Sequence, residues 1–104
     1  MGPLTGAEER TILSVEHLKA NPNPLMHSAL INYTIPAKGE VSLTIYDLTG
    51  RLVRTLVRGM QNPGDYKVRW DGKDDKGKEL GNGIYFYKLT TQGVNDIKKT
   101  VILR

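Results

Sequence analysis

The chain has 104 residues, enough for one domain with one modest hydrophobic core. It contains no cysteine, which excludes disulfides, thiolate metal sites and cysteine nucleophiles. The formal net charge of +4 arises from 15 lysines and arginines against 11 acidic residues. The basic residues alternate with apolar ones instead of clustering, so we expect no nucleic-acid binding. No apolar stretch reaches the roughly 18 residues that span a bilayer, so we expect no membrane insertion.

Apolar and polar residues alternate along most of the chain, which predicts β-strands. The first candidate strand covers residues 12–18, with a short helix as the alternative. The segment Asn21-Pro22-Asn23-Pro24 then interrupts the pattern, because two prolines block both a helix and a sheet ladder. Further strands are predicted over 29–35, 41–46 and 52–58, separated by a turn at 36–39 and a hairpin turn at 47–50.

The second half of the chain continues this alternation. A break at 60–64 precedes a strand at 66–70, and a polar loop at 71–82 precedes an aromatic strand at 83–91. A turn at 92–95 and a last strand at 97–103 complete the series. About seven short strands separated by Gly, Pro, Asn and Asp turns predict an all-β sandwich or barrel. We predict a shared core made of Trp70, Tyr33, Ile45, Val68 and Leu89, with Trp70 as its anchor.

The chain is expected to have two parts. Residues 1–20 are expected to be an N-terminal linker that includes the first candidate strand. Residues 21–104 are expected to form the domain. The start of the chain, Met1-Gly2-Pro3-Leu4, lacks the basic and apolar regions of a signal peptide.

The acidic loop is the strongest candidate for a cation site. Asp71, Asp74 and Asp75 lie in a glycine-containing loop, where carboxylates can converge on calcium. An EF-hand, however, needs an acidic or amide residue where Lys73 stands and a glutamate where Asn82 stands. Three lysines also offset the negative charge of the loop. We therefore favour a tight turn in which aspartates accept backbone N–H groups, and calcium binding is the alternative.

No pattern in the sequence indicates catalysis. His17 and His27 lie ten residues apart without a third partner, and no serine stands in a Gly-x-Ser-x-Gly elbow. The glycines of Gly81-Asn82-Gly83 precede a strand, whereas a phosphate cradle needs a helix N-terminus. The aromatic run 85–87 places one ring outward, which makes a poor platform for sugar stacking. We expect no enzymatic activity and no cofactor.

Several segments, taken in order, resemble a known family. They are Asn21-Pro22-Asn23-Pro24, the strand 31–36, the hairpin 41–53, the segment 64–66 leading into Trp70-Asp71-Gly72 and on to residue 77, the strand 83–89 and the end 98–104. Together they resemble the immunoglobulin-like domains of the flagellar hook-capping (FlgD-like) type and the type A C-terminal sorting domains of the type IX, or Por, secretion system. The resemblance implies an immunoglobulin-like β-sandwich of about seven antiparallel strands. Many sorting domains lack the Trp-Asp-Gly-x-Asp-Asp loop, which belongs to the FlgD-like branch.

The resemblance also implies a function. Such a module directs secretion and cell-surface attachment of a larger cargo protein, exported through the periplasm to the cell surface or the medium. Its partners would be an outer-membrane translocon, a sortase-like peptidase and the upstream cargo domain. We expect the binding residues on the last strand, where a partner can add a strand to an exposed edge: Lys98, Lys99 and Arg104. The alternative is a structural spacer or an ancillary, weakly glycan-binding module of an extracellular enzyme.

Overall fold

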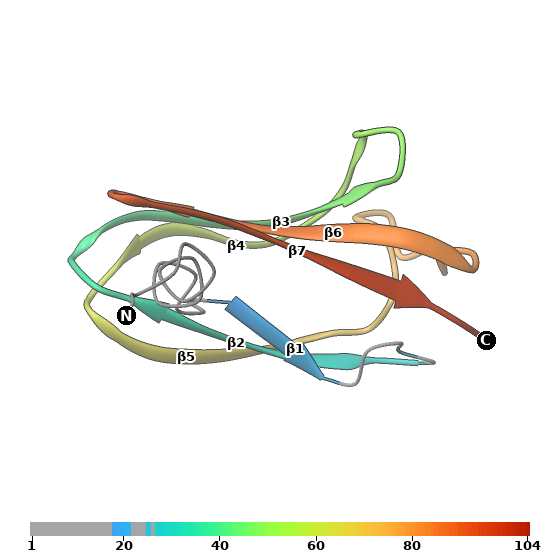
Figure 1. Ribbon diagram of the computed structural model, residues 1–104, viewed down its shortest axis with the longest axis horizontal. Coiled ribbons are helices and arrows are strands. Elements are labelled where there is room, and N and C mark those ends of the chain that lie inside the picture. Colours follow the sequence, from blue (N-terminus) through green and yellow to red (C-terminus); the bar gives the residue numbers. More distant parts are fainter. Residues whose placement is uncertain (1–17, 22–24, 26) are drawn as a thin grey trace, which may run out of the picture.

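The computed structural model describes residues 18–21, 25 and 27–104. These residues form seven strands: β1 (Leu18–Asn21), β2 (Ala29–Ile35), β3 (Gly39–Asp47), β4 (Leu52–Gln61), β5 (Gly64–Trp70), β6 (Gly83–Thr91) and β7 (Val94–Ile102). Two antiparallel sheets, ordered β1-β2-β5 and β4-β3-β6-β7, pack as two layers (Figure 1). The prediction of an all-β, immunoglobulin-like sandwich is confirmed. None of the described residues forms a helix long and apolar enough to cross a membrane.

The core lies between the two sheets, as the alternation predicts. Every second residue of β2 and β3 is buried, including Ile31, Tyr33, Leu43 and Ile45. Four members of the predicted core are confirmed as buried, and they are Trp70, Tyr33, Ile45 and Leu89. The fifth, Val68, is only half-buried and packs against this core, because β5 is an edge strand of its sheet.

Four strands differ in their bounds from the sequence prediction. β3 covers Gly39–Asp47 instead of 41–46, and β5 begins at Gly64 instead of residue 66. β4 runs to Gln61, so that Met60 and Gln61 pair with β3 and the interruption shrinks to Asn62 and Pro63. β7 begins at Val94, because the hairpin between β6 and β7 uses only Gln92 and Gly93. Gly93 has a φ of 79°, a conformation that glycine adopts without strain in a two-residue hairpin turn.

The first strand extends the sandwich toward the N-terminus. β1 pairs with β2, with Leu18 opposite Tyr33, and the Leu18 side chain is fully buried. The sandwich therefore starts no later than Leu18, within the segment 1–20 that was expected to hold a linker and a possible first strand. Of the strand predicted over 12–18, only Leu18 lies within the described residues.

The side chain of Trp70 joins both sheets. It stands at the end of β5, and its ring meets two tyrosines of β6 edge-on, Tyr85 at 6.3 Å and Tyr87 at 5.7 Å between ring centroids. The indole Nε1 donates a hydrogen bond of 2.9 Å to the carbonyl oxygen of Lys73. Trp70 is therefore fully buried, and its only polar group, the indole N–H, still has a hydrogen-bond acceptor.

Replacing Trp70 should destabilise the domain severely. Trp70→Ala is expected to lower the free energy of unfolding by about 3–5 kcal/mol, because it leaves a cavity between the sheets. Trp70→Phe keeps an aromatic ring but loses the indole N–H, so it should cost less. Urea denaturation measures both values. An unchanged midpoint for Trp70→Ala would show that this side chain does not anchor the core.

Candidate functional site

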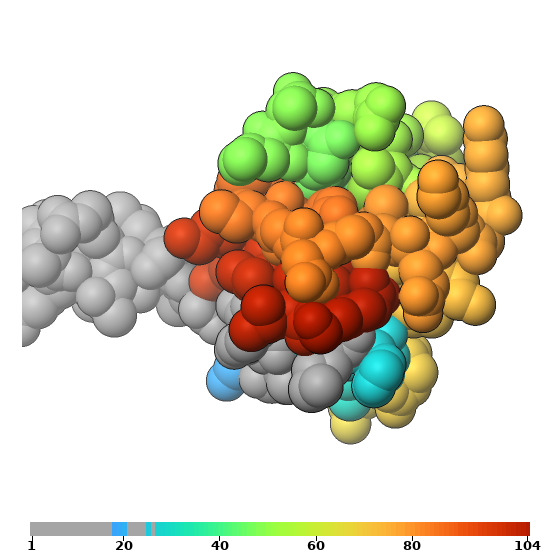
Figure 2. Space-filling model, turned by 90° about the vertical axis from the view of Figure 1, so that its right-hand side faces the viewer, coloured from blue at the N-terminus to red at the C-terminus, as the bar shows by residue number. Residues whose placement is uncertain are grey.

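The loop of residues 71–82 connects β5 to β6 at one end of the sandwich. Figure 2 views this end, where the loop, in orange, lies beside the C-terminal residues, in red. Asp74 organises the tip of the loop. Its Oδ1 atom accepts hydrogen bonds from the backbone N–H groups of Lys76 and Lys78, each at 2.9 Å. Gly77, between them, has a φ of 84°, which favours glycine.

The other two aspartates attach the loop to β4. Asp71 accepts hydrogen bonds from the Lys73 N–H at 3.0 Å and from Arg54 Nη1 at 3.2 Å. Asp75 accepts one from the Thr55 N–H at 3.0 Å. The N–H of Asp75 in turn donates to the Val53 carbonyl at 2.9 Å. Because β4 is an edge strand, these contacts cover part of its exposed edge.

The three aspartates of the loop thus contact three different sets of donors. These contacts are the ones expected of a tight turn that uses side-chain carboxylates as acceptors. Across residues 18–21, 25 and 27–104, no three His, Asp or Glu side chains form a group that could hold a metal ion. His27 is exposed beside this end of the sandwich, and His17 lies outside the described residues.

Arg104 lies against the same loop. Its N–H donates a 2.9 Å hydrogen bond to Asn82 Oδ1, and its guanidinium donates to the Leu80 carbonyl oxygen. A Cβ atom at Gly72 would lie 2.8 Å from Arg104 Nη2. The expected binding residue Arg104 is therefore engaged in holding the C-terminus to the loop.

The two expected binding lysines do not form one cluster. Lys98 pairs across the sheet with Tyr87, whose side chain is buried between the sheets, whereas Lys99 pairs with Phe86. Because cross-strand partners share a face, Lys98 and Lys99 point to opposite faces of β7. Lys99 is exposed on the outer face, and Lys98 is half-buried.

The end of the last strand is not an open edge. The N–H of Leu25 donates to the Val101 carbonyl, and the N–H of Leu103 donates to the Leu25 carbonyl, both at 2.9 Å. Leu25 is fully buried and forms a parallel bridge with Ile102. Strand addition, expected along the last strand, is therefore blocked by the chain itself over residues 101–103.

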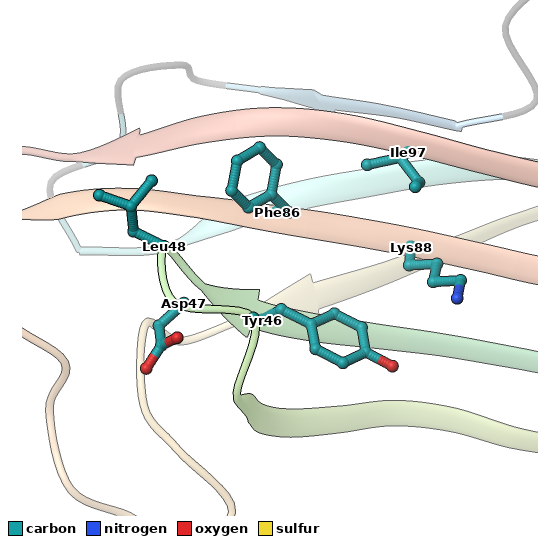
Figure 3. Close-up of a pocket in the computed structure, with 7 residues that line it drawn as sticks. Tyr46, Asp47, Leu48, Phe86, Lys88 and Ile97 are labelled. Atoms are coloured by element: carbon teal, nitrogen blue, oxygen red, sulfur yellow. The ribbon is translucent and has the colours of Figure 1, made fainter.

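An aromatic groove that the sequence alone does not reveal lies on the outer face of the four-stranded sheet. Tyr46 of β3 and Phe86 of β6 are cross-strand partners, so their rings lie on the same face. With Leu48 and Ile97 they line an open groove of about 390 Å³ (Figure 3). Tyr46 and Phe86 are forty residues apart, so only the pairing of β3 with β6 could have brought them together.

The fold defines a class of protein, the immunoglobulin-like β-sandwich domains. Residues 28–94, more than half of the chain, match the FlgD Ig-like domain family. The chain belongs to this family. Among characterised proteins it is similar to the basal-body rod modification protein FlgD of Salmonella typhimurium, with 41% identity over 51 residues. That match covers 49% of the chain and 22% of FlgD.

Three solved protein structures are also similar to this chain. Dimeric latent PorU from Porphyromonas gingivalis has a TM-score of 0.67 and 26% identity over 83% of this chain and 9% of PorU. PorZ, a surface component of the type IX secretion system of the same organism, has a TM-score of 0.56 and 21% identity over 84% of this chain and 11% of PorZ. FlgD from P. aeruginosa has a TM-score of 0.54 and 23% identity over 84% of this chain and 68% of FlgD. The chain is thus similar to PorU and shares its fold with PorZ and with FlgD from P. aeruginosa.

Hydrogen bonding lowers the pKa of Asp74. The backbone N–H of Lys78 contributes most, and the N–H of Lys76 and the two lysine charges add to it. A carboxylate with a lowered folded-state pKa stabilises the fold above its unfolded value of about 3.8, and this stabilisation is lost as pH falls through the folded value.

Stability should therefore fall below about pH 4, in part through Asp74. In Asp74→Asn the amide oxygen can still accept both N–H groups, but the side chain no longer titrates. The variant should be less stable than the parent at pH 7 and should lose less stability between pH 6 and pH 2.5. Thermal unfolding followed by circular dichroism at several pH values measures this difference. Equal losses in the two proteins would contradict the assignment.

Proposed function

We propose that this chain is a non-catalytic recognition module that directs a larger cargo protein through type IX secretion to the bacterial cell surface. The observation that carries the proposal is the likeness to PorU over most of this chain, at 26% identity. The likeness to PorZ supports the same fold in a protein of that secretion system. The proposed partners are an outer-membrane translocon, a sortase-like peptidase and a cargo domain.

The size and the rigidity of the domain support a role as a recognition module. The chain spans about a fifth of the Salmonella FlgD and about a tenth of PorU and PorZ, as a module carried by larger proteins would. A receptor needs a rigid shape to recognise, and both the loop and the C-terminal residues are fixed by several hydrogen bonds. The proposed contact surface centres on β7, with Lys99 on its outer face and Lys98 at its other face.

A second candidate function is a structural module of the flagellar hook-capping kind. It is favoured by the 41% identity with a FlgD protein over 51 residues. In this alternative the domain is a spacer, and its outer surfaces contact neighbouring subunits instead of a translocon. The two functions differ in one observable property, which is whether the domain alone transfers an unrelated protein to the cell surface.

Fusion to a reporter tests the proposal. Residues 18–104 are placed behind an inert reporter that carries its own signal peptide, in a bacterium with type IX secretion. We expect the reporter to reach the surface, as measured by protease accessibility on intact cells. Lys98→Glu with Lys99→Glu should reduce export, because it reverses the charge of β7. Since Lys98 is half-buried, circular dichroism must first show that the double variant folds.

The control carries the same charge change on the other sheet. Lys19→Glu with Lys67→Glu alters two exposed lysines that lie on one face of the three-stranded sheet, both opposite Asn32. This variant should be exported like the parent. If the intact fusion stays in the periplasm while an established sorting domain exports the same reporter, the spacer function replaces the sorting function.

A further inference from the structure

The outer-face groove has the composition of a binding surface. Its lining residues are Tyr46, Asp47, Leu48, Gly50, Phe86, Lys88 and Ile97. Leu48 is 65% exposed and Ile97 is 55% exposed, so two large aliphatic side chains face solvent beside two aromatic rings (Figure 3). Its volume of about 390 Å³ falls in the range of ligand sites, which are lined mainly by apolar and aromatic side chains. Clustered apolar exposure of this kind marks interaction sites.

We propose that this groove binds an acidic segment of a partner protein, one in which bulky apolar side chains alternate with or flank carboxylates. The inference is independent of the proposed secretion function, since it concerns only what the groove can hold. It rests on the apolar lining and on the charges that surround it.

Positive charge surrounds the groove. Lys88 lines it directly, between Tyr46 and Ile97 in Figure 3. Lys99 stands opposite Phe86 on the same face. Arg58 is exposed on that face as well, opposite Ser42, which lies four residues from Tyr46 along β3. Carboxylates on a bound segment would therefore meet cations on both sides of the apolar centre.

Among the described residues, two acidic side chains bear on this charge, Asp47 and Glu40. Asp47 lines the groove, but its Oδ1 atom accepts hydrogen bonds from Thr49 and Arg51, and its Oδ2 lies 3.3 Å from Arg51 Nε. Its charge is thus already balanced within the turn. Glu40, near the opposite end of β3, is six residues from Tyr46 and only two from Ser42, so it lies closer to Arg58 than to the groove.

Two other occupants fit the groove less well. A second copy of this chain would bring the same cationic face against itself, and each copy carries a net charge of +4, so charge repulsion opposes that pairing. A neutral glycan needs several polar side chains that fix its hydroxyl groups. Leu48 and Ile97 supply none, and the Asp47 carboxylate is already occupied. Apolar side chains of a protein segment match this lining.

A titration followed by NMR tests the proposal. The probe is a synthetic peptide in which glutamates alternate with leucine and phenylalanine, added to the ¹⁵N-labelled chain. We expect chemical-shift changes confined to residues 46–50, 84–88 and 95–99. A matched peptide with glutamines in place of glutamates should bind about fivefold more weakly, as should the first peptide in 0.5 M salt.

Paired variants separate the groove from the rest of the surface. Lys88→Glu should weaken binding of the acidic peptide by about fivefold or more, whereas Lys67→Glu, the same change on the other sheet, should leave it unchanged. Phe86→Ser should also weaken binding, with its folding verified by circular dichroism. Lys88→Glu keeps the test valid if Phe86→Ser does not fold.

Three results would overturn the proposal. The first is equal effects of Lys88→Glu and Lys67→Glu, or shifts that map to another face. The second is binding of neutral glucan hexasaccharides at these residues in preference to the peptide. The third is self-association through this face in sedimentation experiments without added peptide. None of these three results changes the outcome of the reporter-export assay. Failure of the groove proposal can therefore be distinguished from failure of the proposed secretion function.

Discussion

The buried indole of Trp70 is the contact on which the rest of the structure depends. Its ring, on β5, meets Tyr85 and Tyr87 of the opposite sheet, and its N–H donates to the carbonyl of Lys73. One side chain therefore joins the two layers of the sandwich to the loop that connects them. Because no cysteine is present, packing of this kind must supply the stability that disulfides give to other small domains.

The fixed loop determines which surfaces remain for recognition. Its aspartates accept backbone and guanidinium hydrogen bonds, it covers part of the edge of β4, and it holds Arg104 at the C-terminus. Leu25 covers the end of β7 in the same way. The strand edges at this end are thus covered, and the outer face of the four-stranded sheet, with the half-buried Tyr46 and Phe86, is the surface that we propose for binding.

Alternation was sufficient to predict most of the fold, and it failed where pairing between distant segments decides the outcome. The strands at 29–35 and 83–91 have the predicted bounds, because each is a run of strictly alternating burial between turn residues. The extension of β4 to Gln61 depends on pairing with Gly39. The groove, the opposite directions of Lys98 and Lys99 and the contacts of Arg104 all depend on register or tertiary packing, which local sequence does not encode.

Hydrogen exchange of the Trp70 indole N–H tests the central claim most directly, because this single proton reports both burial and attachment of the loop. If the indole holds the sheets and loop together, its N–H should exchange only when the whole domain unfolds. The free energy derived from its exchange should then equal the global free energy of unfolding from urea denaturation. Exchange at the rate of an exposed loop amide would contradict the account, since it would mean that the loop opens without unfolding the sandwich.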